Sequence, residues 1–346
     1  MYEAMLWHKE RNGVRCDLCA RLCFVAKGKK GFCLVRVNED NKLYALNYGK
    51  LVTVNVDPIE KKPLFHFHPG SQALSIAAAG CNFRCNFCCN AETSQALVFE
   101  KTGVMPGKEY TPEKIVELAQ EKNCRTISYT YTEPTIFFEF AFRTAKMAHR
   151  SNIENTFVTN GYLTRDAVKK IAKYLDAATV DFKASGDPEF YKNFMSVPKL
   201  DPTPKLDPIF TCLKQMKKQR VFIEITDLII PQVGDSVEKC RKLASWVVSE
   251  LGSDIPFHIL RFHPAHKFLE LPPTPVDTLE KCVEAARESG LRHVYIGNVP
   301  GHEAENTYCY NCRELLIERK GFVVKKIDLV GNRCPNCGAK INVVID

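Results

Sequence analysis

Short apolar runs rich in β-branched and aromatic residues recur through the middle of the chain, and amphipathic stretches fill the intervals between them. The expected strands are residues 73–79, 125–130, 154–159, 177–182, 220–226 and 256–262, with a seventh at 293–297. This alternation predicts an α/β fold built from repeated βα units around a parallel sheet. We expect a partial (βα)6 TIM-like barrel, because right-handed crossovers of this length curl a sheet progressively. A doubly wound open sheet is the alternative.

Two helix starts can be read from local signals. Thr111 before Pro112 predicts an N-cap followed by the first helical residue, and Asp277 with Glu280 three residues later predicts a capping box.

The composition excludes two broad classes of protein. Hydrophobic residues make up 45% and charged residues 25% of the 346 residues, which is close to the average of soluble globular proteins. No uninterrupted apolar run approaches the roughly 18 residues that a membrane span needs. The first residues lack the pattern of a secretory signal, so we expect a cytoplasmic location. The net charge of +8 is spread along the chain and gives only weak support to an acidic or nucleic-acid partner.

Sixteen cysteines are too few for a secreted disulfide scaffold of this length. In a reducing compartment, clustered cysteines bind metal or take part in chemistry. Eleven of them fall into three groups: Cys16, Cys19, Cys23 and Cys33; Cys81, Cys85 and Cys88; and Cys309, Cys312, Cys334 and Cys337.

Polar side chains follow most of the expected strands. Both candidate folds place their active site at the carboxyl ends of parallel strands, so these residues should converge on one rim. They are Glu133, Asn160, Gly161, Asp181, Lys183, Asp227 and His263.

The middle cysteine group forms a CxxxCxxC loop directly after the first strand, with Phe87 before its last cysteine. A 4Fe-4S cluster has four irons, so three protein thiolates leave one iron for an outside ligand. Such an iron can bind a substrate or cofactor and pass it an electron. A zinc site lacking its fourth ligand is the alternative.

This loop resembles the signature of the radical SAM enzymes, in the branch related to pyruvate formate-lyase activating enzyme. Six further segments resemble the radical SAM component of the AmmeMemoRadiSam system. They are residues 57–64, 129–134, 159–161, 180–183, 261–265 and 297–302, so the match covers nearly the whole chain.

The resemblance implies the following roles. Cys81, Cys85 and Cys88 would ligate the cluster, whose open iron chelates S-adenosylmethionine. The cofactor would be lined by Phe87, Glu133, Asn160, Asp181, Lys183 and His263. Two departures stand out. Tyr131 and Thr132 replace glycines that usually precede the glutamate, and Cys89 stands where histidine or glutamine is common.

The outer cysteine groups predict two more metal sites. Cys309-x2-Cys312 and Cys334-x2-Cys337 are paired knuckles, which are typical of a structural zinc ribbon. An additional Fe–S cluster is the alternative for this group. The N-terminal group, with the spacing Cys16-x2-Cys19-x3-Cys23-x9-Cys33, fits either zinc or an auxiliary 4Fe-4S cluster, because four thiolates serve both.

We therefore expect an N-terminal cysteine-rich metal-binding segment over residues 1–60, a radical SAM partial barrel over 61–304 and a zinc-ribbon-like domain over 305–346. The expected function is an oxidoreductase that cleaves S-adenosylmethionine reductively to a 5′-deoxyadenosyl radical, which abstracts hydrogen from an unidentified protein or small molecule. Glycyl-radical activation of a partner protein is the first alternative, and an Fe–S electron carrier is an alternative from another class. The expected partners are a low-potential electron donor and the substrate, with neither a membrane nor a nucleic acid among them.

Overall fold

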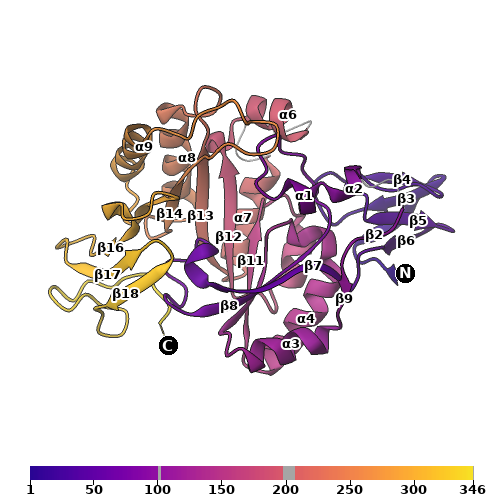
Figure 1. Ribbon diagram of the computed structural model, residues 1–346, viewed down its shortest axis with the longest axis horizontal. Helices are drawn as coiled ribbons and strands as arrows, with labels where there is room; N and C mark the ends of the chain where they lie inside the picture. The colour runs from indigo at the N-terminus through magenta and orange to yellow at the C-terminus, as the bar shows by residue number, and fades with distance from the viewer. Residues whose placement is uncertain (100–102, 198–206, 346) are drawn as a thin grey trace.

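The computed structural model describes residues 1–99, 103–197 and 207–345. A nine-stranded sheet runs through its centre in the order β15-β14-β13-β12-β11-β10-β8-β7-β9 (Figure 1). In that order the strands are Val294–Gly297, Phe257–Arg261, Phe222–Ile229, Ala177–Lys183, Glu154–Thr159, Thr126–Tyr129, Gln72–Ala78, Lys50–Pro58 and Lys108–Glu109. The seven expected strands are all present, each within three residues of its expected bounds.

The seven strands from β8 to β15 are parallel, whereas β7 and β9 add an antiparallel edge. Parallel strands that are neighbours in the sheet also follow one another along the chain, except that β9 comes between β8 and β10 in the sequence. A doubly wound sheet reverses its strand order at a switch point, and the described strands show no such reversal. Within the described residues no hydrogen-bonded ladder joins β15 to β9, so closure of this sheet into a partial barrel stays a prediction.

Helices connect the parallel strands and pack against the sheet. The longer ones are α3 (Pro112–Glu121), α4 (Phe138–Arg150), α5 (Arg165–Ile171), α6 (Pro188–Met195), α7 (Pro208–Lys218), α8 (Val237–Glu250) and α9 (Val276–Glu288). Thr111 caps α3 as expected, because its side chain accepts a hydrogen bond from the Lys114 N–H at 3.2 Å. The expected capping box at Asp277 is wrong. Helix α9 begins at Val276, one residue before Asp277, so Asp277 lies inside the first turn. There its negative charge interacts favourably with the helix dipole.

The two faces of the parallel sheet differ in polarity. Alternate residues of each strand point to opposite faces. One set joins the apolar core that the helices cover: Ile127, Phe157, Val180, Ile225 and Ile259. The other set is largely polar and includes Ser75, Ser128, Thr156, Thr179, Glu224 and Thr226, all of them buried. The sheet therefore has one face for packing and one face suited to polar chemistry.

Two small β units flank the large sheet and lie at opposite ends of the molecule (Figure 1). The N-terminal unit holds two three-stranded sheets, formed by β1 (Tyr2–Glu3), β6 (Lys42–Ala45) and β5 (Arg36–Glu39), and by β2 (Trp7–Glu10), β3 (Gly13–Cys16) and β4 (Phe24–Ala26). The C-terminal sheet holds β16 (Thr307–Tyr308), β17 (Leu315–Lys320) and β18 (Val323–Ile327).

Buried arginines tie both small units to the large sheet and its helices. Arg36 of β5 donates two hydrogen bonds of 2.8 Å to the carboxylate of Glu139 in α4, and both side chains are at most 2% exposed. Arg319 of β17 donates to the Phe65 carbonyl at 2.7 Å and to Thr307 Oγ1 at 2.8 Å. Because an unpaired buried charge is costly, each contact fixes how its unit docks.

Asp227 generates a pH-dependent prediction. It lies in β13, bonded to the Ser185 N–H at 2.8 Å and the Ser185 hydroxyl at 2.7 Å, instead of following the strand as expected. Burial raises the pKa of Asp227 to about 6. The folded chain therefore binds this proton more tightly than the unfolded chain does. Its stabilising contribution is full below about pH 4 and is lost as the pH rises through about 6.

Compared with the Asp227→Asn variant, the wild-type protein should lose about 3 kcal/mol of unfolding free energy as the pH rises from about 4 to about 7. Thermal melting of both proteins across this range measures the difference. Melting temperatures that run parallel at all pH values would contradict the assignment.

Candidate functional site

The CxxxCxxC loop lies where β8 ends, at the carboxyl end of the parallel sheet. The three sulfur-bearing side chains of Cys81, Cys85 and Cys88 line a cavity of about 450 Å³. The cavity is also lined by residues that follow the neighbouring strands: Thr130, Tyr131, Thr132, Glu133, Asn160, Asp181 and Lys183. Of the residues expected at this rim, Glu133, Asn160, Asp181 and Lys183 line the cavity, whereas Gly161, Asp227 and His263 are not part of its lining.

Hydrogen bonds to backbone groups in three distant parts of the chain hold the loop in place. They come from the end of α6, from the turn near residue 267 and from the N-terminal unit. The bonds are Arg84 N to Met195 O (3.1 Å), Asn86 N to Phe194 O (2.9 Å), Lys267 N to Asn86 O (2.8 Å) and Arg84 Nη2 to Phe32 O (2.8 Å). A loop tied at several points can present its thiols in a fixed arrangement without metal.

The donor set fits an iron–sulfur cluster. Burial raises the pKa of Cys81 to about 12 and raises that of Cys85 well above its ordinary value, so a metal must displace protons from both thiols. Within the described residues, the three sulfur atoms do not all lie within 4.8 Å of one another, as the ligands of a single ion would. Three thiols that border one large cavity, at wider spacing, suit a cluster with one iron facing the cavity.

Glu133 organises one wall of the cavity. Its Oε1 accepts hydrogen bonds from Thr159 Oγ1 at 2.8 Å and from the Thr135 N–H at 3.1 Å, while its Oε2 accepts from the Asn160 N–H at 2.8 Å. Burial raises the pKa of Glu133, although these bonds favour its charged form. The Asn160 amide in turn donates to Asn82 Oδ1 at 2.6 Å, which links this wall to the cysteine loop.

Asp181 and Lys183, at the end of β12, form an ion pair in the lining. Lys183 Nζ lies 3.3 Å from Asp181 Oδ2, and Asp181 Oδ1 accepts from Thr226 at 2.5 Å. Burial alone would lower the pKa of Lys183, but Asp181 and Cys85 raise it above its ordinary value. The positive charge of Lys183 therefore lies near the cysteine loop, where it attracts thiolates and anionic groups of a ligand.

The other expected site residues lie outside the lining or at its edge. Phe87 is buried behind the loop, with its ring centroid 5.5 Å from that of Phe190 and 5.8 Å from that of Phe268. His263 is exposed and outside the lining, with Nε2 3.5 Å from the carbonyl of Asn298, which does line the cavity. Cys89 lines the cavity next to Cys88. The role of each in cofactor binding stays a prediction.

The sequence analysis missed a buried charge cluster beside the cavity. Asp57 accepts hydrogen bonds from Lys61 at 2.8 Å, from Lys62 at 2.7 Å and from the Tyr131 hydroxyl. Although burial would raise the pKa of Asp57, these three donors hold it well below its ordinary value. The only signal in the sequence was that residues 57–64 belong to a segment with a family resemblance.

This cluster explains how Tyr131 can stand where a glycine is usual. The backbone of Tyr131 has a φ of 60°, in the left-handed region that favours glycine. The Lys62 ammonium lies 4.5 Å from the centroid of its ring, and its hydroxyl binds Asp57. These side-chain contacts offset a backbone cost of roughly 1–2 kcal/mol for a residue with a Cβ.

Lys62 is 1% exposed and Lys61 is 43% exposed, although both bind the same carboxylate. The Lys62→Met variant should lose about 3 kcal/mol of stability, because it removes a buried partner of Asp57. The matched Lys61→Met variant should lose less than about 1 kcal/mol, since water already screens that pair. Urea unfolding of the two variants measures the difference. Equal losses would mean that burial does not distinguish the two lysines.

The C-terminal cysteines form a second candidate site. The sulfur atoms of Cys309, Cys312, Cys334 and Cys337 all lie within 4.8 Å of one another, and this group could hold a metal ion. Two of the sulfur pairs, Cys309 with Cys337 and Cys312 with Cys334, are 3.6 Å apart. Hydrogen bonding from Asn311 is the main cause that lowers the pKa of Cys337 to about 6, so part of this thiol ionises before metal binds.

A Cys312→Ser variant should lose one equivalent of zinc per chain while its iron content stays unchanged, because the four-thiolate shell is broken far from the large cavity. Elemental analysis of purified protein measures both metals, with Cys124→Ala as the control that keeps every grouped cysteine. Loss of iron in place of zinc would contradict a zinc site.

Comparison with known families agrees with this geometry. Residues 75–247, half of the chain, match the radical SAM superfamily. The matched region runs from β8 to α8 and contains the cysteine loop and its cavity. This chain belongs to the radical SAM superfamily.

Sequence relatives extend over the whole chain. The uncharacterized protein MJ0808 of Methanocaldococcus jannaschii is 44% identical over all of both chains. The uncharacterized protein MJ0674 of the same organism is 22% identical, over 81% of this chain and 76% of its own.

Among solved structures, a radical SAM methyltransferase from Sphaerobacter thermophilus covers 67% of this chain and 68% of its own, with 16% identity and a TM-score of 0.51. A domain of pyruvate-formate lyase-activating enzyme from Bacteroides vulgatus covers 50% of this chain and 99% of its own, with 16% identity and a TM-score of 0.42. The first of these likenesses shows a shared fold. Within the described residues, no helix is both long and apolar enough to cross a lipid bilayer.

Proposed function

We propose that this chain is an enzyme that cleaves S-adenosylmethionine reductively and uses the resulting radical to abstract hydrogen from a substrate. The observation that carries the proposal is the placement of Cys81, Cys85 and Cys88 on one loop that borders a cavity of about 450 Å³. An electron carrier would need no such space beside its cluster. The alternative of an Fe–S electron carrier is therefore the less favoured one.

The three thiolates would hold a 4Fe-4S cluster, and the open iron would take the amino and carboxylate groups of S-adenosylmethionine. When bound, the cluster supplies a low-potential electron to the sulfonium, which yields methionine and a 5′-deoxyadenosyl radical. Zinc in the C-terminal site completes the set of proposed cofactors.

The chain's own residues position and shield this chemistry. Glu133 fixes the turn at Thr159 and Asn160 through both of its carboxylate oxygens. The Lys183 ammonium, which is held by Asp181, supplies a fixed positive charge at the cavity wall. Apolar side chains of Val158, Met195, Leu228 and Leu260 complete the lining. A lining that combines apolar and polar groups suits a cofactor with an adenosyl part and an amino acid part.

Two finer assignments are also part of this proposal. The residue segments quoted above suggest the radical SAM component of the AmmeMemoRadiSam system, with the oxidoreductase chemistry of the activating-enzyme branch. The hydrogen donor is an unidentified protein or small molecule, and an external low-potential donor supplies the electron. Phe322 of the C-terminal hairpin also lines the cavity, so the substrate would meet residues from both the sheet and the C-terminal unit.

Anaerobic reconstitution with iron and sulfide, followed by reduction in the presence of S-adenosylmethionine, should yield 5′-deoxyadenosine. The Cys85→Ala variant should reduce the yield to background, because it removes one of three cluster ligands. Cys124→Ala is the matched control, since this buried cysteine precedes β10 at the opposite end of the sheet and should leave the yield unchanged. Equal yields from the wild-type protein and Cys85→Ala would refute the proposed function.

A further inference from the structure

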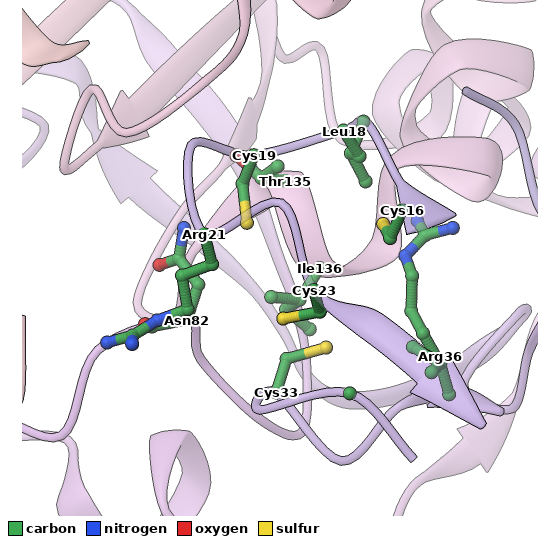
Figure 2. Close-up of a pocket in the computed structure, with 12 residues that line it drawn as sticks. Cys16, Leu18, Cys19, Arg21, Cys23, Cys33, Arg36, Asn82, Thr135 and Ile136 are labelled. Atoms are coloured by element: carbon green, nitrogen blue, oxygen red, sulfur yellow. The ribbon is translucent and has the colours of Figure 1, made fainter. Parts of the chain in front are cut away.

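The four cysteines of the N-terminal unit surround one enclosed space. Cys16 ends β3, Cys19 and Cys23 lie in the loop that follows, and Cys33 lies in the turn before β5. Figure 2 shows the four sulfur atoms around one shared space. The remaining lining includes the apolar side chains of Leu18, Val25 and Ile136.

Sulfur spacing distinguishes this site from the C-terminal one. Zinc with bonds of about 2.3 Å to four thiolates holds neighbouring sulfur atoms about 3.8 Å apart. The C-terminal four meet that requirement, with two sulfur pairs at 3.6 Å. Within the described residues, no three of the N-terminal sulfur atoms lie within 4.8 Å of one another. The same wider spacing is found for Cys81, Cys85 and Cys88. Membership of the radical SAM superfamily implies that these three hold a cluster.

The surroundings favour a charged group with sulfur acceptors. Arg21 and Arg84 both lie over the ring of Phe32, with their guanidinium carbons 3.4 Å and 4.4 Å from its centroid. Neither forms a salt bridge with a carboxylate in the part of the chain that the structure describes. The buried Asn82, which also lines the space, has an Nδ2 donor without a hydrogen-bond partner there. Hydrogen-bond donors beside a cluster commonly bind its sulfur atoms.

We propose that Cys16, Cys19, Cys23 and Cys33 hold an auxiliary 4Fe-4S cluster in which every iron has a protein ligand. Four thiolates on an oxidised cluster carry a net charge of about −2, which the guanidinium groups of Arg21 and Arg84 balance, since within the described residues both hydrogen-bond to backbone carbonyls and not to carboxylates. A tetrathiolate zinc site would have the same net charge, so the spacing of the sulfur atoms selects the cluster. Its coordination is closed, and S-adenosylmethionine therefore has no iron to bind.

The auxiliary site lies next to the radical SAM loop. Asn82 directly follows Cys81 and lines the N-terminal space, while its Oδ1 accepts a hydrogen bond from Asn160 in the wall of the large cavity at 2.6 Å. One residue thus contacts both sites. Iron analysis of the wild-type protein alone would not separate the two clusters, so the test must remove one of them.

The decisive protein is the full-length variant in which Cys81, Cys85 and Cys88 are all alanine, because it leaves the N-terminal site intact. After anaerobic reconstitution with iron and sulfide, it should retain four iron atoms and four acid-labile sulfides per chain, half of the wild-type content. Its reduced form should give an electron paramagnetic resonance signal that S-adenosylmethionine does not change. Zinc should remain at one equivalent, held by the C-terminal site.

A second variant, with Cys19 and Cys33 as alanine, should also fall to half of the wild-type iron, and its remaining signal should change with S-adenosylmethionine. Two equivalents of zinc in the triple variant, or the absence of iron and sulfide from it, would overturn the proposal. A signal from the triple variant that responds to S-adenosylmethionine would overturn the closed coordination. Failure of the wild-type protein to form 5′-deoxyadenosine would refute the proposed function without changing these metal contents.

Discussion

The cysteine loop at the carboxyl end of β8 must be held in one position, and the rest of the structure depends on this constraint. Its thiols are useful only if they keep a fixed spacing beside an open cavity, and residues 80–90 have little regular structure of their own. The restraint comes from backbone groups in α6, in the turn near Lys267 and in the N-terminal unit. Segments that are far apart in the sequence must therefore all dock correctly before the site exists.

Buried charges fix this docking. Arg36 with Glu139 and Arg319 with the Phe65 carbonyl each join segments that come from different units. A buried ion pair adds little net stability compared with apolar packing, but the loss of one partner is costly. Such contacts therefore penalise misdocked arrangements more than they stabilise the correct one. This explains why a chain with a large apolar core also buries charged groups where its units meet.

The three cysteine groups use the same ligand at different spacing. The C-terminal thiols are close enough for one ion, whereas the described structure holds the sulfur atoms of the other two groups farther apart. Ligand identity cannot separate zinc from a cluster, because thiolates suit both. The distance over which the fold holds the sulfur atoms apart can separate them.

The sequence by itself determined the order of the strands, the start of α3, and the grouping of eleven cysteines, because periodicity, capping and motif spacing are local properties. It also placed Glu133, Asn160, Asp181 and Lys183 at strand ends, which in a parallel sheet meet at one edge. It could not reveal the Asp57–Lys62–Tyr131 cluster or the double contact of Asn82, since these depend on loops brought together from distant positions. The separation of the sulfur atoms was likewise decided only by the tertiary structure, because packing of the surrounding backbone, and not the number of residues between cysteines, sets how far apart the thiols lie.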